Sequence, residues 1–139
     1  MPMPEPVMGT EEDVILSRVV ALILDEIIAL VCALLVGGVV GGLLGSSALA
    51  IFLVLAILLG YHVVLEGLYG QTLGKRLLGI IVVKKNGDPC SMGASVVRNV
   101  LRIIDALFHY ALALVVMLVN DDRQRIGDIA ADTVVVRAR

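Results

Sequence analysis

The chain has 139 residues, of which 59% are hydrophobic and 17% are charged, and its formal net charge is −2. Soluble domains are about 45–50% apolar and about 25% charged, so this composition argues against a soluble enzyme and a disordered chain. The slight excess of acidic residues gives no basic footprint for nucleic acid, which is therefore not an expected partner. The mean hydropathy of +0.99 predicts a single small integral membrane domain, residues 1–139, surrounded by the lipid bilayer.

Residues 1–13 are predicted to form an acidic N-terminal tail and residues 14–37 the first transmembrane helix. About 20 apolar residues suffice to cross the hydrocarbon core of a bilayer. This span is unusual because Arg18, Asp25 and Glu26 lie among its apolar residues. The tail lacks the basic segment that begins a secretory signal, so no such signal is expected.

Residues 46–66 are predicted to be the second transmembrane helix, which ends at Glu66, and the loop between the two spans carries no charge. Glycines within residues 37–42, and the spacing of Gly41 and Gly45, supply small residues that let membrane helices approach closely. Two or three short spans cannot enclose a pathway alone. A transport pathway would therefore require a homo-oligomer, in which these glycines would let helices pack closely.

Residues 67–92 are predicted to be a cytoplasmic loop, because they contain four basic residues and the loop between the spans has none. This places the N-terminus in the cytoplasm and the protein in the cell membrane. The β-branched run Ile80–Val83, followed by an Asn-Gly turn signal, predicts a short strand. Residues 70–76 resemble a phosphate-binding loop, but two positions do not match. Tyr69 stands where the pattern requires glycine, and Arg76 where it requires serine or threonine. We interpret the segment as a turn with a basic membrane-surface anchor.

Residues 94–119 are predicted to be a third helical segment whose charged residues share one face, at positions 98, 102, 105 and 109. Two arrangements are open: a third full span, or a re-entrant hairpin bent near Phe108–Tyr110. We favour the hairpin, because residues 120–139 contain a second strand, Thr133–Val136, whose evident partner is Ile80–Val83. The expected fold is thus an all-α membrane protein with two transmembrane helices, this third segment and a short cytoplasmic β-strand pair.

Ionisable groups inside a membrane need a partner or a function, because each costs about 2.5–3.5 kcal/mol at the bilayer centre. The first span carries one excess negative charge and the third segment one excess positive charge, so a cluster between them would be neutral. Such a network can simply fix helix packing. Asp25 is the deepest acid, and we favour it as a proton or cation site whose pKa Arg18 and Arg102 lower by opposite charge.

No catalytic arrangement is evident, and the protein is not expected to be an enzyme or to hold a cofactor. His62 and His109 show no metal-ligand spacing with cysteine or carboxylate residues, and Cys32 and Cys90 suggest neither a metal site nor a disulfide.

Four separated motifs, from about Ser17 to Arg137, resemble the RDD family of small multi-pass membrane proteins, named for one arginine and two aspartates. Arg18 and Asp25 resemble its first motif, and Glu66 with residues 70–79 resembles its central loop. The third and fourth motifs are matched by Arg98, Arg102 and Asp105, and by residues 124–128, respectively. Asp128 is favoured as the second named aspartate, with Asp105 as its rival.

One departure is that Asp132 stands where the family usually has glycine before the last strand. Either the glycine-dependent turn is disturbed, or it is built without a positive φ angle.

The resemblance implies an integral membrane protein of poorly defined role, with transport of a small ion or solute suggested and cation/proton exchange proposed for some family members. The alternative is a non-transporting scaffold or accessory subunit with a structural ion network. The candidate ligand- or ion-coupling residues are Arg18, Asp25, Glu66, Arg98, Arg102, Asp105 and Asp128.

Overall fold

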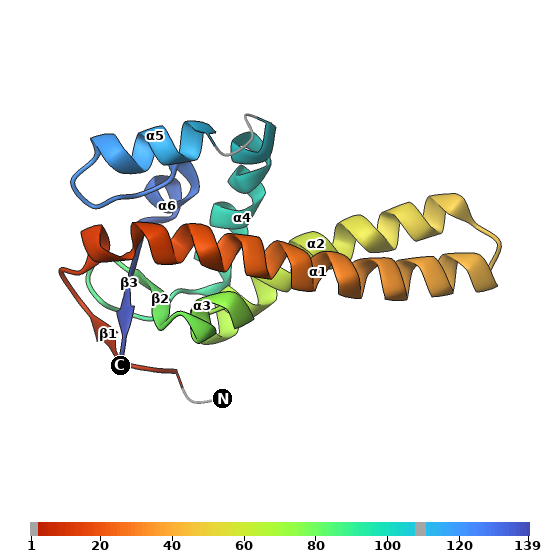
Figure 1. The fold of residues 1–139 in the computed structure, drawn as a ribbon, viewed down its shortest axis with the longest axis horizontal. Helices are drawn as coiled ribbons and strands as arrows, with labels where there is room; N and C mark the ends of the chain where they lie inside the picture. Colours follow the sequence, from red (N-terminus) through yellow and green to blue (C-terminus); the bar gives the residue numbers. More distant parts are fainter. Residues whose placement is uncertain (1–2, 108–110) are drawn as a thin grey trace.

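The computed structural model describes the backbone of residues 3–107 and 111–139 and the side chains of residues 3–103 and 114–139. Helices dominate, and a small sheet joins three distant parts of the chain, as Figure 1 shows. The helices are η1 (Glu11–Val14), α1 (Ile15–Leu43), α2 (Ser47–Tyr69), α3 (Leu73–Leu77), α4 (Met92–Leu107), α5 (Ala111–Val119) and α6 (Ile126–Ala131). The strands are β1 (Pro6–Val7), β2 (Ile80–Lys84) and β3 (Thr133–Ala138).

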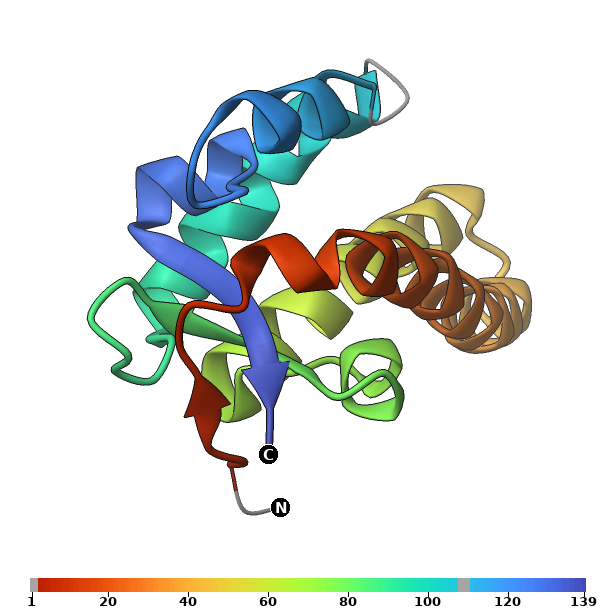
Figure 2. The same cartoon turned by 60° about the vertical axis from the view of Figure 1, so that its left-hand side comes forward.

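Helices α1 and α2 form an antiparallel hairpin that extends beyond the other elements (Figures 1 and 2), and both are long and apolar enough to cross a membrane. Of the 18 consecutive residues that are most apolar in each helix, 22% are buried in the first helix and 6% in the second. Apolar side chains therefore cover the outside of this hairpin.

A stripe of small residues on α1 faces α2 at four-residue spacing: Ala21, Ala29, Ala33, Gly37 and Gly41 are all buried. A Cβ atom on Gly37 would lie 2.7 Å from Val54 Cγ2, and one on Gly41 would overlap Ala50. Helix α1 continues through its glycines to Leu43 because α2 packs directly on them. Two glycines behind the predicted homo-oligomer thus serve packing within one chain, and the oligomer stays a prediction.

The chain leaves α2 through a tight turn that leads into α3. Gly70 ends α2 with a φ angle of 69°, and its N–H donates to Glu66 O. A side chain here would meet Val82 O at 2.9 Å, so the position requires glycine for both conformation and space. Thr72 then caps α3. This turn brings the first turn of α3 back against α1.

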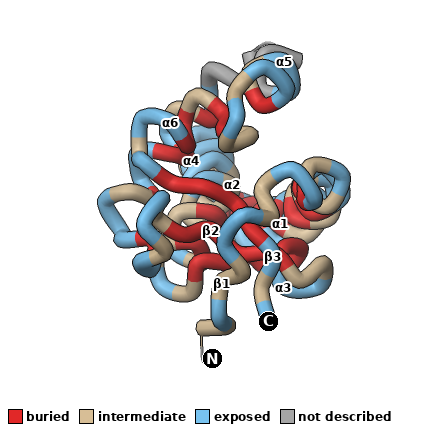
Figure 3. The backbone as a smooth tube through the Cα atoms, turned by 90° about the vertical axis from the view of Figure 1, so that its left-hand side faces the viewer, coloured by how far each residue is buried: buried red, intermediate tan, exposed pale blue. Residues whose placement is uncertain are grey.

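The predicted strand pair is confirmed: β2 pairs antiparallel with β3, and Val82 lies opposite Val135. Sequence reasoning missed a third strand, β1, which pairs with the other edge of β3 and draws in the acidic tail. Buried residues follow β2 and β3 (Figure 3), because alternate side chains fill two clusters on opposite faces of the sheet. The sheet therefore brings residues 6–7, 80–84 and 133–138 together at one end of the molecule.

The turn before β3 is built with an aspartate in the left-handed region. Asp132 has a φ angle of 56° and ends α6, with its N–H donating to Ile129 O. The backbone thus keeps the positive φ angle that glycine normally supplies, and aspartate is among the non-glycine residues that adopt it most readily.

Helix α4 turns its polar face inward and its apolar face outward. Ser95, Arg98 and Asn99 are buried, whereas Val100 and Ile103 are among its exposed residues. The polar face of this amphipathic helix therefore closes over the other helices. The bend predicted near Phe108–Tyr110 lies outside the described residues.

The glycine stripe can be tested with neighbouring substitutions. Gly41→Ala forces a methyl group into Ala50 and should lower the free energy of unfolding by about 1–3 kcal/mol. Gly42→Ala meets nothing within 4 Å and should raise it by about 0.5–1 kcal/mol, because alanine favours the helix. Thermal unfolding of both variants in detergent checks this, and equal shifts would contradict the packing described here.

Candidate functional site: a buried charge network

Asp128, in the first turn of α6, ties three helices together. Its Oδ2 accepts a 2.6 Å hydrogen bond from Arg18 Nη2 of α1, and its Oδ1 accepts one of 2.7 Å from Arg98 Nε of α4. The backbone N–H of Arg125 also donates to Oδ2, at 3.1 Å. Asp128 is fully buried. Its carboxylate is thus the common acceptor that fixes α1, α4 and α6 relative to one another.

Glu66, at the end of α2, is the second buried carboxylate. It accepts hydrogen bonds from Lys75 Nζ of α3, from Arg98 Nη1 at 2.5 Å and from Asn99 Nδ2 at 3.0 Å. Arg98 therefore bridges the two carboxylates, with only 1% of its side chain exposed. We call Arg18, Lys75, Arg98, Arg125, Glu66 and Asp128 the charge network.

Close backbone contact holds this network in place. A Cβ atom on Gly127 would lie 2.5 Å from Arg98 O, so α6 can approach the backbone of α4 only because position 127 is glycine. The next residue is Asp128. The contact therefore brings its carboxylate within reach of the Arg98 side chain.

The electrostatics follow from this arrangement. Burial alone would raise the pKa of Asp128, but Arg98, Arg18 and Arg125 hold it well below its usual range. Burial lowers the pKa of Lys75 to about 8, against the opposing effect of Glu66. Lys75 is therefore not the surface anchor suggested by the sequence, because its ammonium group lies inside against Glu66.

Asp25 lies beside the network but is held by uncharged donors. Its Oδ1 accepts 2.8 Å hydrogen bonds from Tyr61 Oη and from the backbone N–H of Gly74, and its Oδ2 accepts one from Thr72 Oγ1. Only 1% of Asp25 is exposed. It joins α1 to α2 and to the start of α3.

The two arginines proposed to influence Asp25 make their described ion pairs with other acids. Arg18 binds Asp128, and Arg102 donates to Glu26. The reason is geometric: Arg18 precedes Asp25 by about two helical turns, and α3 brings donors directly to the carboxylate. Glu26 pairs with Arg102 and with His62 Nε2 at 3.3 Å, and 43% of its side chain is exposed. The predicted contact between the first span and the third segment is this Glu26–Arg102 pair.

Of the seven candidate residues, four belong to the charge network: Arg18, Glu66, Arg98 and Asp128. Asp25 and Arg102 lie beside it, in separate contacts. The side chain of Asp105, like that of His109, lies outside the described residues. Asp128 is thus an aspartate bound by Arg18.

Sequence reasoning missed several members of the site: Lys75, Asn99, Tyr61 and Thr72. The available signals were weak. Tyr61 and His62 are adjacent polar aromatic residues in an otherwise apolar helix, and Thr72 lies in a turn rich in glycine. Asn99 follows Arg98 and lies off the helical face of positions 98, 102, 105 and 109.

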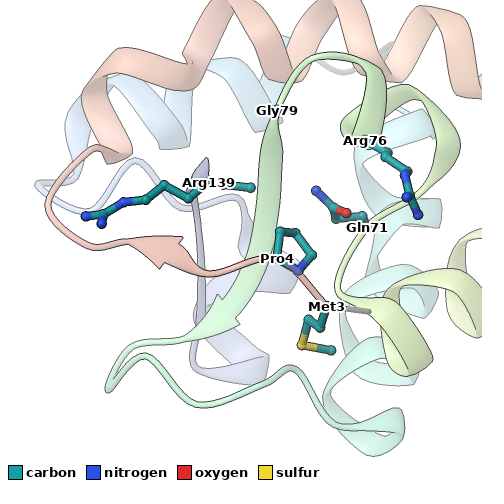
Figure 4. Close-up of a pocket in the computed structure, with 7 residues that line it drawn as sticks. Met3, Pro4, Gln71, Arg76, Gly79 and Arg139 are labelled. Carbon is teal, nitrogen blue, oxygen red and sulfur yellow. The ribbon is translucent and has the colours of Figure 1, made fainter. Parts of the chain in front are cut away.

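A cavity of about 350 Å³ lies away from the network, at the end of the sheet. Its lining includes Gln71, Arg76 and Arg139, and Figure 4 shows the two arginine side chains pointing away from each other. Gln71 Nε2 already donates a 2.9 Å hydrogen bond to Ile80 O. Within the described residues, no three His, Cys, Asp or Glu side chains gather as metal ligands would.

Comparison with known proteins gives a family and a distant relative. The model of the RDD family matches residues 14–132. An uncharacterized protein of Haemophilus influenzae is 32% identical over 81 residues, which make up 56% of this chain and 52% of the relative. The chain thus spans about half the length of the curated relative it matches. No solved structure matches the chain.

The dependence of the fold on Asp128 can be measured directly. Asp128→Asn leaves Arg18 buried without its anionic partner and Arg98 with Glu66 alone, and it should lower the free energy of unfolding by about 3–5 kcal/mol. The control, Asp122→Asn, breaks a half-exposed pair with Lys85 and should cost about 0–1 kcal/mol. Thermal unfolding in detergent distinguishes them, and equal stability of the two variants would contradict the role given to Asp128.

Proposed function

The chain belongs to the RDD family, and we propose that it is an integral membrane protein in which α1 and α2 cross the bilayer side by side. The observation that supports this is the inverted polarity of the molecule: Arg98, Glu66 and Asp128 are buried, and large apolar residues are exposed along both helices. Helix α1, with 29 residues, is about 43 Å long, which exceeds the roughly 30 Å of a hydrocarbon core.

The outward face of α4 extends this argument. Val96, Val97, Val100 and Ile103 are each at least 40% exposed, and the α5 residues Leu114, Val115, Leu118 and Val119 are exposed too. Lipid is the solvent that favours such a surface. We therefore place α4 and α5 in the bilayer as a re-entrant hairpin rather than as a full third span.

The pairing of the three strands supports a location of all three on the same side of the membrane. Because β3 pairs with both β1 and β2, the N-terminal segment, the loop after α2 and the C-terminal strand share one side. That side carries the basic residues of the loop, which favours the cytoplasm by the positive-inside rule. The proposed location is the cell membrane.

This orientation predicts where fused reporters lie. A reporter after Arg139 and one before Met1 should both be active in the cytoplasm of intact cells, because their neighbouring strands belong to the same sheet. Reporters that work in the cytoplasm and reporters that work outside it provide the readout in parallel. An external C-terminus would contradict both the re-entrant hairpin and the sheet.

The role that the geometry supports best is a non-transporting membrane scaffold or accessory subunit. Each carboxylate of the network is bound by two or more cationic groups, which fixes helices in place. Residues 27–60 contain no Asp, Glu, His, Lys or Arg, so one chain offers no titratable relay through that half of the hairpin. The proposal includes no enzymatic reaction.

A second candidate, cation/proton exchange by a homo-oligomer, is favoured by one observation. Among the described residues, the hydrogen bonds to the buried Asp25 carboxylate come from neutral donors, so binding a proton or a small cation there would break no ion pair with them. Neighbouring chains would have to complete the pathway.

Asp25→Asn separates the two roles. An asparagine carbonyl can still accept from Tyr61 and Gly74, and its amide can donate to the Thr72 hydroxyl, so the fold should survive the loss of charge. In proteoliposomes under a pH or sodium gradient, the scaffold proposal predicts no flux above empty vesicles for wild type, Asp25→Asn or the exposed control Asp121→Asn. Flux in wild type and Asp121→Asn that Asp25→Asn abolishes would overturn the scaffold and support exchange.

A further inference from the structure

The charge network contains more positive than negative charge. Among the described side chains, four cationic ones, Arg18, Lys75, Arg98 and Arg125, meet two carboxylates, and all of them are at most 11% exposed. The other described acids nearby do not correct this excess, because Glu26 pairs with Arg102, and Asp25 accepts from neutral donors. Uncompensated charge is costly in a buried place, so this network is suited to an additional anion.

Arg125 is the cation with the poorest pairing in the network. Its Nε is buried, has no hydrogen-bond partner within the described part of the chain, and lies 3.9 Å from Asp128 Oδ2. Asp128 already accepts from Arg18, from Arg98 and from the backbone N–H of Arg125 itself. The Arg125 guanidinium therefore points into the network without an acceptor at hydrogen-bond distance from Nε.

The surroundings of Arg125 are also repulsive. Burial lowers its pKa to about 10, which Asp128 only partly offsets, and Arg98, Arg102 and Arg18 lower it further. Several guanidinium groups thus face the same small region. About 10% of the Arg125 side chain remains exposed, which leaves an approach from outside.

We propose that Arg125 anchors a binding site for a small phosphate-type oxyanion, supplied either as free phosphate or as the headgroup of an anionic lipid. The planar guanidinium fork binds such oxygens in pairs, and the excess charge of the network provides the attraction. The site would neutralise part of that excess. It is independent of both roles proposed for Asp25, because Asp25 makes none of these contacts.

The first experiment titrates inorganic phosphate against the wild-type chain in detergent, at constant pH and with ionic strength held by sodium gluconate. The unfolding temperature is expected to rise with the logarithm of the phosphate concentration, by about 4–8 °C once phosphate exceeds its dissociation constant about tenfold. A rise that is linear in phosphate concentration, as exclusion of the salt from the protein surface would produce, or no rise, would overturn the site.

Variants at Arg125 give the second test. Its expected result differs from the result that a purely structural arginine would give. Arg125→Gln should abolish the phosphate shift, yet leave the unfolding temperature in phosphate-free buffer unchanged or higher, since it removes a poorly paired buried cation. Arg125→Lys should keep the charge but weaken the shift, because an ammonium cannot form the fork. The control is Arg137→Gln, whose side chain is 58% exposed and which should keep the full shift.

A lower phosphate-free unfolding temperature in Arg125→Gln, with the phosphate shift retained, would mean a structural arginine and would overturn the proposal. Nanodiscs identify the source of the anion. Stabilisation by phosphatidylglycerol over phosphatidylcholine without free phosphate, lost in Arg125→Gln, would support the lipid headgroup. Stabilisation by free phosphate alone in phosphatidylcholine nanodiscs would support the soluble anion, and stabilisation by neither would again overturn the site.

Discussion

The arrangement of this molecule depends on one side chain, Arg98, shared between two buried carboxylates. Its Nη1 binds Glu66 on α2 and its Nε binds Asp128 on α6, so the planar guanidinium sets both the distance and the relative rotation of these helices. Arg18 and Lys75 then attach α1 and α3 to the same two acids. Five helices are thereby fixed by contacts whose geometry is far more directional than the packing of small apolar residues along α1.

This construction is what an apolar surrounding requires. Away from water, a charged group has no alternative partner, so polar side chains gather inside while valine and leucine cover the outside. The same logic explains the glycines and alanines of α1: without a hydrophobic driving force between the helices, close approach and shape complementarity hold α1 to α2. Buried charge and small-residue packing are therefore complementary parts of one solution.

Much of the fold follows from local patterns in the sequence. Long apolar runs predict the two main helices, and β-branched runs predict β2 and β3. Pairing among the charges was harder, because Arg18 and Asp128 are 110 residues apart and a helical repeat shows only the face on which a residue lies. Strand β1 was missed because a two-residue strand has no periodicity, and Lys75 because a basic loop residue usually stays in water. The neutral donors to Asp25 come from a turn whose path only tertiary contacts determine.

The separation of Arg18 and Asp128 has a consequence for biosynthesis. The ribosome completes α1 and α2 long before it reaches α6, so in the membrane arrangement proposed above the helical hairpin can enter the bilayer while Arg18 still lacks its acceptor. Glu66 is likewise synthesised about thirty residues before its partner Arg98. The nascent chain must hold these charges near the water-facing end of the hairpin until translation finishes α6 and β3. The ion pairs of the charge network therefore form late, once the C-terminal segment has been synthesised. Before that, membrane insertases, chaperones or quality-control proteases have access to a chain whose helices these pairs do not yet hold together.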